Sequence, residues 1–219
     1  MKAPYLRYDS VRVFAERLLD EHWPSREIPV EIELIAERDL GLQIIPMPSL
    51  QEAYDVESFL SADRTSITVD ERLFKPHLEG RYNFTLAHEV GHLRMHGDVY
   101  SRASAVPIGE WLPFMEEVNR DPQFDRQANN FAGLVLVPSP QLRSPIVEEA
   151  VRAVDDSCVD EGLRAGLEPY IVCEAFSSLA CEILAPNFKV SAEVIQIRLQ
   201  REGRWPIVDL DDEDMIVLR

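Results

Sequence analysis

The pattern His-Glu-x-x-His, which begins at His88, constrains this chain more than any other feature. Its second histidine is His92, and a third, His96, follows four residues later. Because an α-helix repeats every 3.6 residues, the three histidines would lie along one face of a helix, with Glu89 beside the first. Two imidazoles one turn apart can bind one zinc ion and leave the intervening glutamate free to act on water. The pattern therefore predicts a helix that carries a metal site.

The residues before this motif predict two helices and a small sheet. Apolar side chains recur at helical spacing over residues 11–22 and 32–40, and Gly41 is expected to cap the second helix. Residues 42–46 are typical of a short strand, and residues 59–70 of a strand, a turn and a second strand. A sheet edge beside a zinc helix can hold an extended peptide by strand addition, so the order of these elements bears on function.

The helix that carries the motif is expected to begin at Asn83 as its N-cap and to end before Gly97. Gly91 lies inside it and costs about 1 kcal/mol relative to alanine, which indicates the close approach of another backbone. A second apolar row on another face predicts that the helix is largely buried; it consists of Leu86, Val90 and Leu93.

Residues 96–122 are expected to form a packed covering loop with one short helical piece at 111–118. A further helix is predicted to start at Asp121, followed by Pro122 at its first position. Two polar residues of that helix, Asp125 and Asn129, share a face in an otherwise apolar context. A metal site would satisfy them.

A catalytic zinc ion needs three protein ligands and an open position. His96 is not expected to be the third ligand, because the metzincin pattern requires a glycine turn and a more distant histidine, and neither follows here. Two histidines and one carboxylate remain as the ligand class. The acidic candidates downstream are Glu110, Glu116, Glu117, Asp121 and Asp125. Spacing alone does not choose between Glu117 and Asp125.

The C-terminal part of the chain is expected to be helical over residues 146–156, 168–184 and 191–201. Residues 188–199 resemble part of a helix-turn-helix, with Ser191 as N-cap. The chain carries a net charge of −17, which repels phosphate backbones, whereas helices that read DNA are usually basic. We therefore expect a role in the helical bundle and no direct nucleic-acid binding.

The composition is that of a globular protein, 46 % apolar and 28 % charged. No secretory signal and no apolar run of membrane-spanning length is expected, and the three cysteines show no Cys-x-x-Cys spacing. These features predict a cytoplasmic protein that does not bind a membrane.

Two further segments, which follow the histidine motif, indicate a resemblance to a known family. Asp125-x-x-Ala128-Asn129-x-Phe131-Ala132 and then Leu136-Val137-Pro138 follow the histidines at residues 88–96. With the strand-turn-strand before them, they resemble the ImmA/IrrE family of metallopeptidases. The expected fold is therefore α+β, with a zincin-like peptidase domain over residues 1–140. Its small N-terminal-side sheet packs on the HExxH helix, and a helix-turn-helix-like region over 141–219 packs on the domain.

The resemblance implies a role for each residue that matches the family's motifs. His88 and His92 would be zinc ligands, Glu89 the catalytic base and Asp125 the third ligand. The family usually has glutamate at the last of these positions. Aspartate is one methylene shorter, so the two helices must approach more closely or bind the metal less tightly.

Two more residues are expected to support this site. Asn129 would hold a ligand histidine or Asp125. His96 would orient a ligand or lie on the substrate side, and a buried structural histidine is an equal alternative. The metal would be Zn²⁺, with Mn²⁺ as the alternative in the cell.

The resemblance also implies a function. The chain would be a zinc-dependent endopeptidase that cleaves an XRE-type helix-turn-helix repressor and so relieves repression in a stress, mobile-element or defence response. The alternative is a non-cleaving, zinc-containing module that sequesters a repressor or an antitoxin. A DNA-binding regulator that uses residues 188–201 is a third hypothesis, against which the net charge argues.

Overall fold

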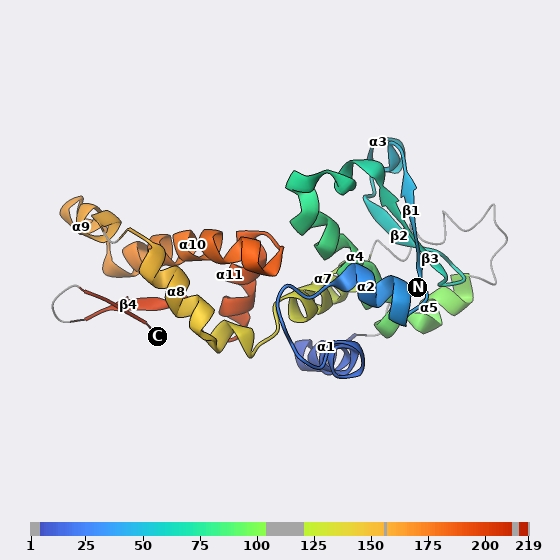
Figure 1. Cartoon of the computed structure of the whole chain (residues 1–219), viewed down its shortest axis with the longest axis horizontal. Coiled ribbons are helices and arrows are strands. Elements are labelled where there is room, and N and C mark those ends of the chain that lie inside the picture. The colour runs from blue at the N-terminus through green and yellow to red at the C-terminus, as the bar shows by residue number, and fades with distance from the viewer. Residues whose placement is uncertain (1–4, 104–120, 156, 212–214, 219) are drawn as a thin grey trace. The chain divides into compact units, whose positions relative to one another are not determined.

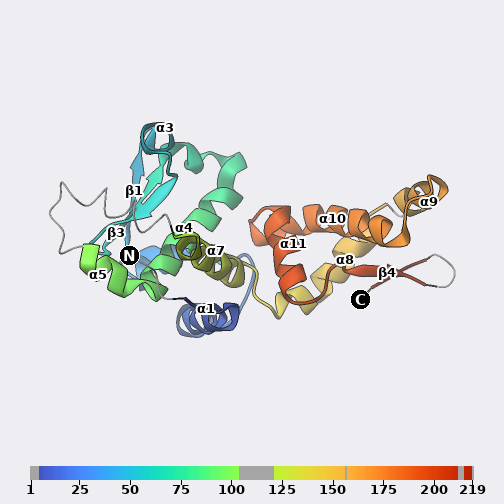
Figure 2. The same ribbon diagram turned by 180° about the vertical axis from the view of Figure 1, so that it is seen from behind.

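The computed structural model of the chain describes residues 5–103, 121–155, 157–211 and 215–218 (Figure 1). The chain forms two compact units, Met1–Leu136 and Val137–Arg219. Both combine helices with a small sheet, which confirms the α+β class (Figures 1 and 2). The assignment of domains to 1–140 and 141–219 stays a prediction.

The first unit begins with the two helices that the apolar spacing predicts. Helix α1 spans Tyr8–His22 and buries one apolar row, which consists of Val11, Ala15, Leu18 and Leu19. Helix α2 is only Ile32–Leu34 and continues as the π-helical turn η1, Ile35–Asp39. Gly41 follows it with φ +68°, the left-handed conformation expected of a C-terminal glycine.

The predicted sheet has three strands, β1 (Gln43–Met47), β2 (Ser58–Leu60) and β3 (Ser66–Asp70), in the order β1-β3-β2. Strands β2 and β3 pair antiparallel, which confirms the strand, turn and strand, and β1 pairs parallel to β3. Helix α3 (Leu50–Tyr54) connects β1 to β2. Strand β2 thus lies at an edge of this sheet and packs on α4 (Glu79–Met95).

Helix α4 carries the histidine motif and is largely buried, as predicted. It begins earlier than expected, because the 3₁₀ turns η2 (Glu71–Phe74) and η3 (Pro76–Leu78) lead directly into it. Its N-cap is Leu78, so the expected N-cap at Asn83 is wrong. Gly97 follows the C-cap residue His96 but begins helix α5, Gly97–Ala103, where a loop was expected.

Helix α7, Pro122–Leu136, begins where Asp121 and Pro122 predict. The Asp121 carboxylate accepts a hydrogen bond of 3.0 Å from the backbone N–H of Gln123, which satisfies one free donor of the first turn. Helix α7 packs against both α4 and α1 (Figures 1 and 2). The expected helical piece at 111–118 and the candidate ligands Glu110, Glu116 and Glu117 lie outside the described residues.

Helices α4 and α7 meet at Gly91. A Cβ atom on Gly91 would lie 3.0 Å from Cδ1 of Phe131 on α7. The predicted close approach is therefore present, but the neighbour is a side chain and not a backbone.

The second unit is mainly helical, as expected. It consists of η5 (Gln141–Arg143), α8 (Pro145–Ala153), α9 (Ser157–Arg164), α10 (Pro169–Phe188) and α11 (Ala192–Arg201). Helix α10 contacts each of the other three α-helices of this unit. After these helices, β4 (Val208–Leu210) pairs antiparallel with β5 (Ile216–Leu218).

Helix α10 is long and apolar enough to cross a membrane by length and composition alone, contrary to the expectation that no such run exists. Of its most apolar 18 residues, 44 % are buried in the structure, and the core helix of a globular unit passes the same test. Its buried residues, Phe176 and Leu184 among them, form the core of the second unit.

The helix-turn-helix-like segment is tied into this unit by Arg198, which is only 2 % exposed. Its guanidinium donates hydrogen bonds to the carbonyl of Val137 (3.2 Å) and to Ser139 Oγ (3.0 Å), and it forms an ion pair with Glu202 (3.0 Å). Ser191 caps α11, as predicted, by accepting from the backbone N–H of Val194. The geometry favours the expected bundle role over DNA contact.

Candidate metal centre

Helices α4 and α7 bring His88, His92 and Asp125 together. One ligand atom from each of the three lies within 4.8 Å of the others. The two Nε2 atoms are 2.9 Å apart, and Asp125 Oδ1 lies 3.9 Å from His88 Nε2 and 3.7 Å from His92 Nε2. Because the histidines are one turn apart on α4 and the carboxylate comes from the first turn of α7, the packing of these two helices creates the group.

Asn129 lies one turn beyond Asp125 and contacts the first histidine. Its Oδ1 is 2.8 Å from His88 Nδ1. A carbonyl oxygen can only accept, so Nδ1 of His88 carries a hydrogen, which leaves Nε2 as the ring nitrogen available to a metal ion. This nitrogen faces the other two members of the group.

His92 is more deeply enclosed, with 3 % of its surface exposed. The ring stacks on Phe124, with ring centroids 4.1 Å apart, and its Nδ1 lies 2.9 Å from His96 Nδ1. Burial, together with the neighbouring His88 and His96, holds the pKa of His92 well below its ordinary value. The ring is therefore neutral at physiological pH and can act as a ligand.

His96 does not belong to the His-His-Asp group. It is buried, 1 % exposed, and stacks on Phe124 with ring centroids 4.4 Å apart. Its Nε2 lies 2.9 Å from Gln127 Oε1. Burial lowers its pKa, although the hydrogen bond with Gln127 opposes that shift.

Glu89 is 4 % exposed and lies under the edge of the sheet. Ser58 of β2 donates its hydroxyl hydrogen to Glu89 Oε1 over 2.5 Å. Burial raises the pKa of Glu89, while the charge of His88 and the bond from Ser58 lower it. The net shift is upward, which suits a carboxylate that must accept a proton near neutral pH.

A tyrosine hydroxyl can stabilise an oxyanion, and α4 and α5 each carry a buried tyrosine. Tyr100 of α5 is buried, with its ring 6.2 Å from that of His92; burial and the charges of Glu89 and Asp125 hold its pKa well above the ordinary value. Tyr82 packs on Phe74 with ring centroids 5.0 Å apart, and burial and the charge of Glu33 raise its pKa. Of the two, only Tyr100 contacts the histidine cluster.

Sequence reasoning missed Ser58, Phe124 and Gln127 as parts of this site. The signal for Gln127 was available, because it is a polar residue on the buried apolar face of α7, three residues after Phe124 and four before Phe131. Ser58 carries no such signal. Its contact with Glu89 spans 31 residues of sequence and depends on how the sheet packs.

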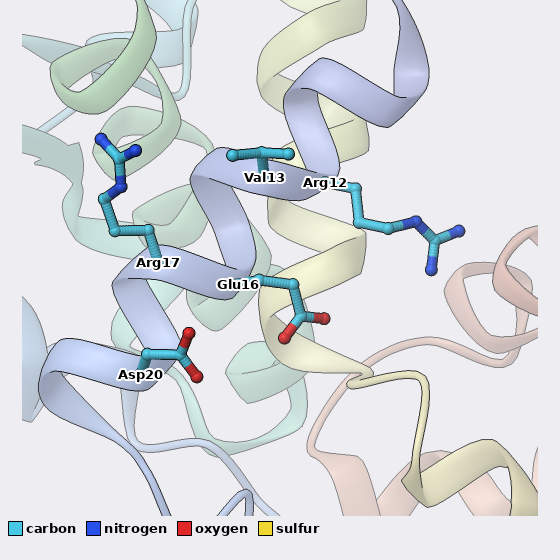
Figure 3. Close-up of a pocket in the computed structure, with 5 residues that line it drawn as sticks. All are labelled: Arg12, Val13, Glu16, Arg17 and Asp20. Carbon is cyan, nitrogen blue, oxygen red and sulfur yellow. The ribbon is translucent and has the colours of Figure 1, made fainter.

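A hollow of about 330 Å³ lies elsewhere, on the exposed face of α1 (Figure 3). The residues that line it all come from that helix: Arg12, Val13, Glu16, Arg17 and Asp20. The two arginine side chains extend away from each other in Figure 3, and Arg26 pairs with both carboxylates. The hollow is therefore a solvated face of α1, whose carboxylates pair with Arg26, and none of the histidines of the metal group lines it.

Among solved structures, one of a Mycobacterium tuberculosis transcriptional regulator is similar over 98 % of this chain, with 16 % identity and a TM-score of 0.47. The chain spans 60 % of that protein's length. Among curated proteins, none matches.

The family comparison is more specific. The family model Peptidase_M78, described as the IrrE N-terminal-like domain, matches residues 37–155. The match covers more than half of the chain and includes the sheet, α4 and α7. It confirms the resemblance that the two motifs indicate. The chain belongs to the IrrE N-terminal-like domain family, Peptidase_M78.

Proposed function

We propose that this protein is a zinc-dependent endopeptidase that cleaves a helix-turn-helix transcriptional repressor and thereby relieves repression. The observation that carries the proposal is the His-His-Asp group of α4 and α7, with the buried Glu89 next to His88 on α4. Membership of a peptidase family supports the same reaction class.

The donor set fits a zinc ion. Ligands about 2.1 Å from a tetrahedral zinc ion lie about 3.4 Å from one another. The separations of 2.9, 3.7 and 3.9 Å among the three donor atoms lie on both sides of this value. The Nδ1 atoms of His88 and His92 are both engaged elsewhere, so the Nε2 atoms of the two rings are the ones available to a single cation bound beside them. We assign His88, His92 and Asp125 as the ligands.

His88, His92 and Asp125 would hold the ion, which would supply Lewis acidity toward a carbonyl group and a water molecule of lowered pKa. Glu89 accepts the proton of the attacking water and later donates it to the leaving amine. The hydroxyl of Ser58 holds one carboxylate oxygen of Glu89, which orients the other. Tyr100 is the group we propose for stabilising negative charge on the scissile carbonyl, because it is the tyrosine in contact with the histidine cluster.

The substrate binds as an extended segment along strand β2. This strand lies at an edge of the described sheet, and its Ser58 contacts Glu89 directly. A strand added there would pass close to the catalytic carboxylate. The net charge of −17 attracts a basic protein, and DNA-binding repressors are basic on their binding face. The reaction is proposed to take place in the cytoplasm, without contact with a membrane.

The test is cleavage of the repressor encoded next to the gene, with Glu89→Gln as the informative variant. We expect no cleavage and an unchanged zinc content, because the amide cannot accept the proton while the ligands remain. Glu79→Gln, at an exposed position on the same helix, is the matched control and should cleave normally. Retained activity in Glu89→Gln would refute the mechanism.

A second candidate is a regulatory module that binds the repressor without cutting it. The aspartate at position 125, where the family usually has glutamate, favours this reading because a shorter ligand can weaken the metal site. The same incubation separates the two functions. A stable complex in which the repressor stays intact in the presence of zinc would favour sequestration over cleavage.

A further inference from the structure

Three buried polar side chains, beginning with His92, form a chain of hydrogen bonds on the side of that ring away from His88. His92, His96 and Gln127 are 3 %, 1 % and 2 % exposed. His92 Nδ1 lies 2.9 Å from His96 Nδ1, and His96 Nε2 lies 2.9 Å from Gln127 Oε1. Hydrogen bonds in such a dry environment have fixed partners, because no solvent can replace either member.

The side-chain oxygen of Gln127 determines which atom donates in each of these hydrogen bonds. An amide oxygen only accepts, so His96 must carry its hydrogen on Nε2 and keep a lone pair on Nδ1. That lone pair accepts the hydrogen of His92 Nδ1. The Nε2 atom of His92 is then free of hydrogen, and it is the atom that faces His88 Nε2 at 2.9 Å.

The opposite direction would disable the site. If the amide nitrogen of Gln127 faced His96, the ring hydrogens of His96 and His92 would each move to the other nitrogen of the same ring. His92 would then carry a hydrogen on Nε2, the nitrogen that faces the other two donors. A ring in that form cannot bind a metal through that atom without first changing its tautomer.

We infer that Gln127 is a positioning residue, which selects the metal-binding tautomer and ring orientation of His92 through His96. The inference rests on the proposed metal site. It gives the two ligand histidines separate anchors on α7, because Asn129 holds His88 directly while Gln127 reaches His92 through a second imidazole. It also accounts for a buried amide on the apolar face between Phe124 and Phe131.

A packing role for Gln127 would predict something different. If the side chain only fills space, an apolar residue of equal length should serve as well, and the ring tautomers should not change. Gln127→Met tests this, because methionine keeps the length and loses the acceptor. Gln127→Glu is the rescue variant, since a carboxylate can also only accept.

The first measurement is two-bond hydrogen–nitrogen NMR of the histidine rings in the metal-free protein, at mildly alkaline pH. We expect His92 to carry its hydrogen on Nδ1 and His96 to carry it on Nε2. In Gln127→Met, His92 should move toward the Nε2–H form that predominates in free histidine. In Gln127→Glu the wild-type pattern should persist.

The second measurement is zinc affinity by competition with a chelating indicator. Gln127→Met should bind zinc about 10- to 100-fold more weakly, as is typical when a group that orients a ligand histidine is removed. Gln127→Glu should bind at least as tightly as the wild type. Gln123→Met, one turn earlier on α7, is the control and should change neither affinity nor tautomer.

Two results would overturn the inference. One is a wild-type His92 that carries its hydrogen on Nε2, which can be read even if a variant fails to fold. The other is a folded Gln127→Met with unchanged tautomers and zinc affinity. The tautomers are read without metal or substrate, so a wild type that shows the expected tautomers but cuts no repressor would count against the peptidase proposal alone.

Discussion

At the scale of single residues, Asp125 is the least constrained member of the metal group. Its carboxylate is farther from each histidine than the histidines are from each other, and its side chain is 52 % exposed. The pKa of Asp125 is raised, because partial burial of the carboxylate outweighs the opposing effect of the charge of His88. A short carboxylate at this position thus has room to shift when it binds an ion.

We predict that Asp125→Ala loses zinc as completely as His92→Ala does. The loss should exceed the roughly 10- to 100-fold effect of removing a group that only orients a ligand. Asp125→Glu should restore binding, because the longer side chain covers the 3.7 Å and 3.9 Å separations more easily. Metal analysis of the three purified variants beside the wild type measures this.

The contrary result is also informative. If the zinc content of Asp125→Ala were unchanged, Glu117 would be assigned as the third ligand, because it is the other carboxylate that the sequence spacing allows.

At the scale of elements, the proposed role of Asp125 as a ligand depends on how closely α7 approaches α4. The two helices meet at Gly91, where a Cβ atom would lie 3.0 Å from the ring of Phe131. A glycine beside His92 thus lets α7 lie close to α4. In the proposed site, such a close helix pair would bring the shorter aspartate within reach of the ion, and without it the metal would bind less tightly.

Gly91→Ala should therefore destabilise the protein, although the same change in an open helix stabilises by about 1 kcal/mol. We expect a net loss of about 1–3 kcal/mol, the cost of overpacking a filled core, in urea unfolding of the metal-free protein. Zinc affinity should fall in parallel as the helices separate.

The matched variant for this prediction is Gly91→Ala with Phe131→Leu. The smaller side chain makes room for the new methyl group, so the two changes together should cost less than the sum of each alone. Strict additivity, or a more stable Gly91→Ala, would contradict the proposed contact.

A second element-scale prediction concerns Asp70, at the end of β3. Its carboxylate accepts the backbone N–H of Gln51 at 2.7 Å and that of Arg72 at 2.9 Å, which joins α3, β3 and η2. Burial alone would raise the pKa of Asp70, but these two donors and the charge of Arg72 outweigh it and lower the pKa. Asp70→Ala should cost about 1–2 kcal/mol, as is typical of a lost helix cap.

The sign of the pH dependence follows from that lowered pKa. The contribution of Asp70 is fully present above the unfolded pKa of an aspartate, about 3.9, and is lost as the pH falls through the lower folded pKa. The stability difference between wild type and Asp70→Ala, measured by unfolding across acidic pH, should shrink in this range. A constant difference would contradict the role of the charge.

The sequence predicts those elements whose signal is local. Apolar periodicity identifies α1, α4 and α7, and alternation identifies β2 and β3. The start of α4 was misplaced because two 3₁₀ turns lead into it without a polar cap.

Contacts between distant residues could not be predicted in this way. The pairs Ser58–Glu89 and His96–Gln127 each span 31 residues, and nothing in their spacing indicates that packing brings them together.

At the scale of the whole molecule, charge and fold together argue against DNA recognition by α11. The net charge is −17, and Arg198, one of the two arginines on which a recognition helix would depend, is buried among partners of its own unit. Its positive charge is neutralised by Glu202, 3.0 Å away.

Arg198→Ala should consequently unfold the second unit more easily and should not alter any interaction with DNA. Breaking a buried ion pair by removing one partner typically costs about 3–5 kcal/mol, which thermal unfolding would detect. Arg201→Ala, at an exposed position on the same helix, is the control and should change stability little. Salt-sensitive DNA binding that disappears with Arg198 would restore the regulator hypothesis.

The packing of α4 on α7 has one more consequence. Apolar residues of both helices, among them Leu86, Val90, Phe131 and Val135, have no exposed surface. Their burial holds the helices together whether or not an ion is present, unlike in a zinc finger, whose chain unfolds without metal. Under the proposed function, loss of zinc would stop the reaction and leave the protein folded, so that its activity would follow the supply of zinc reversibly, without new synthesis or degradation of the chain.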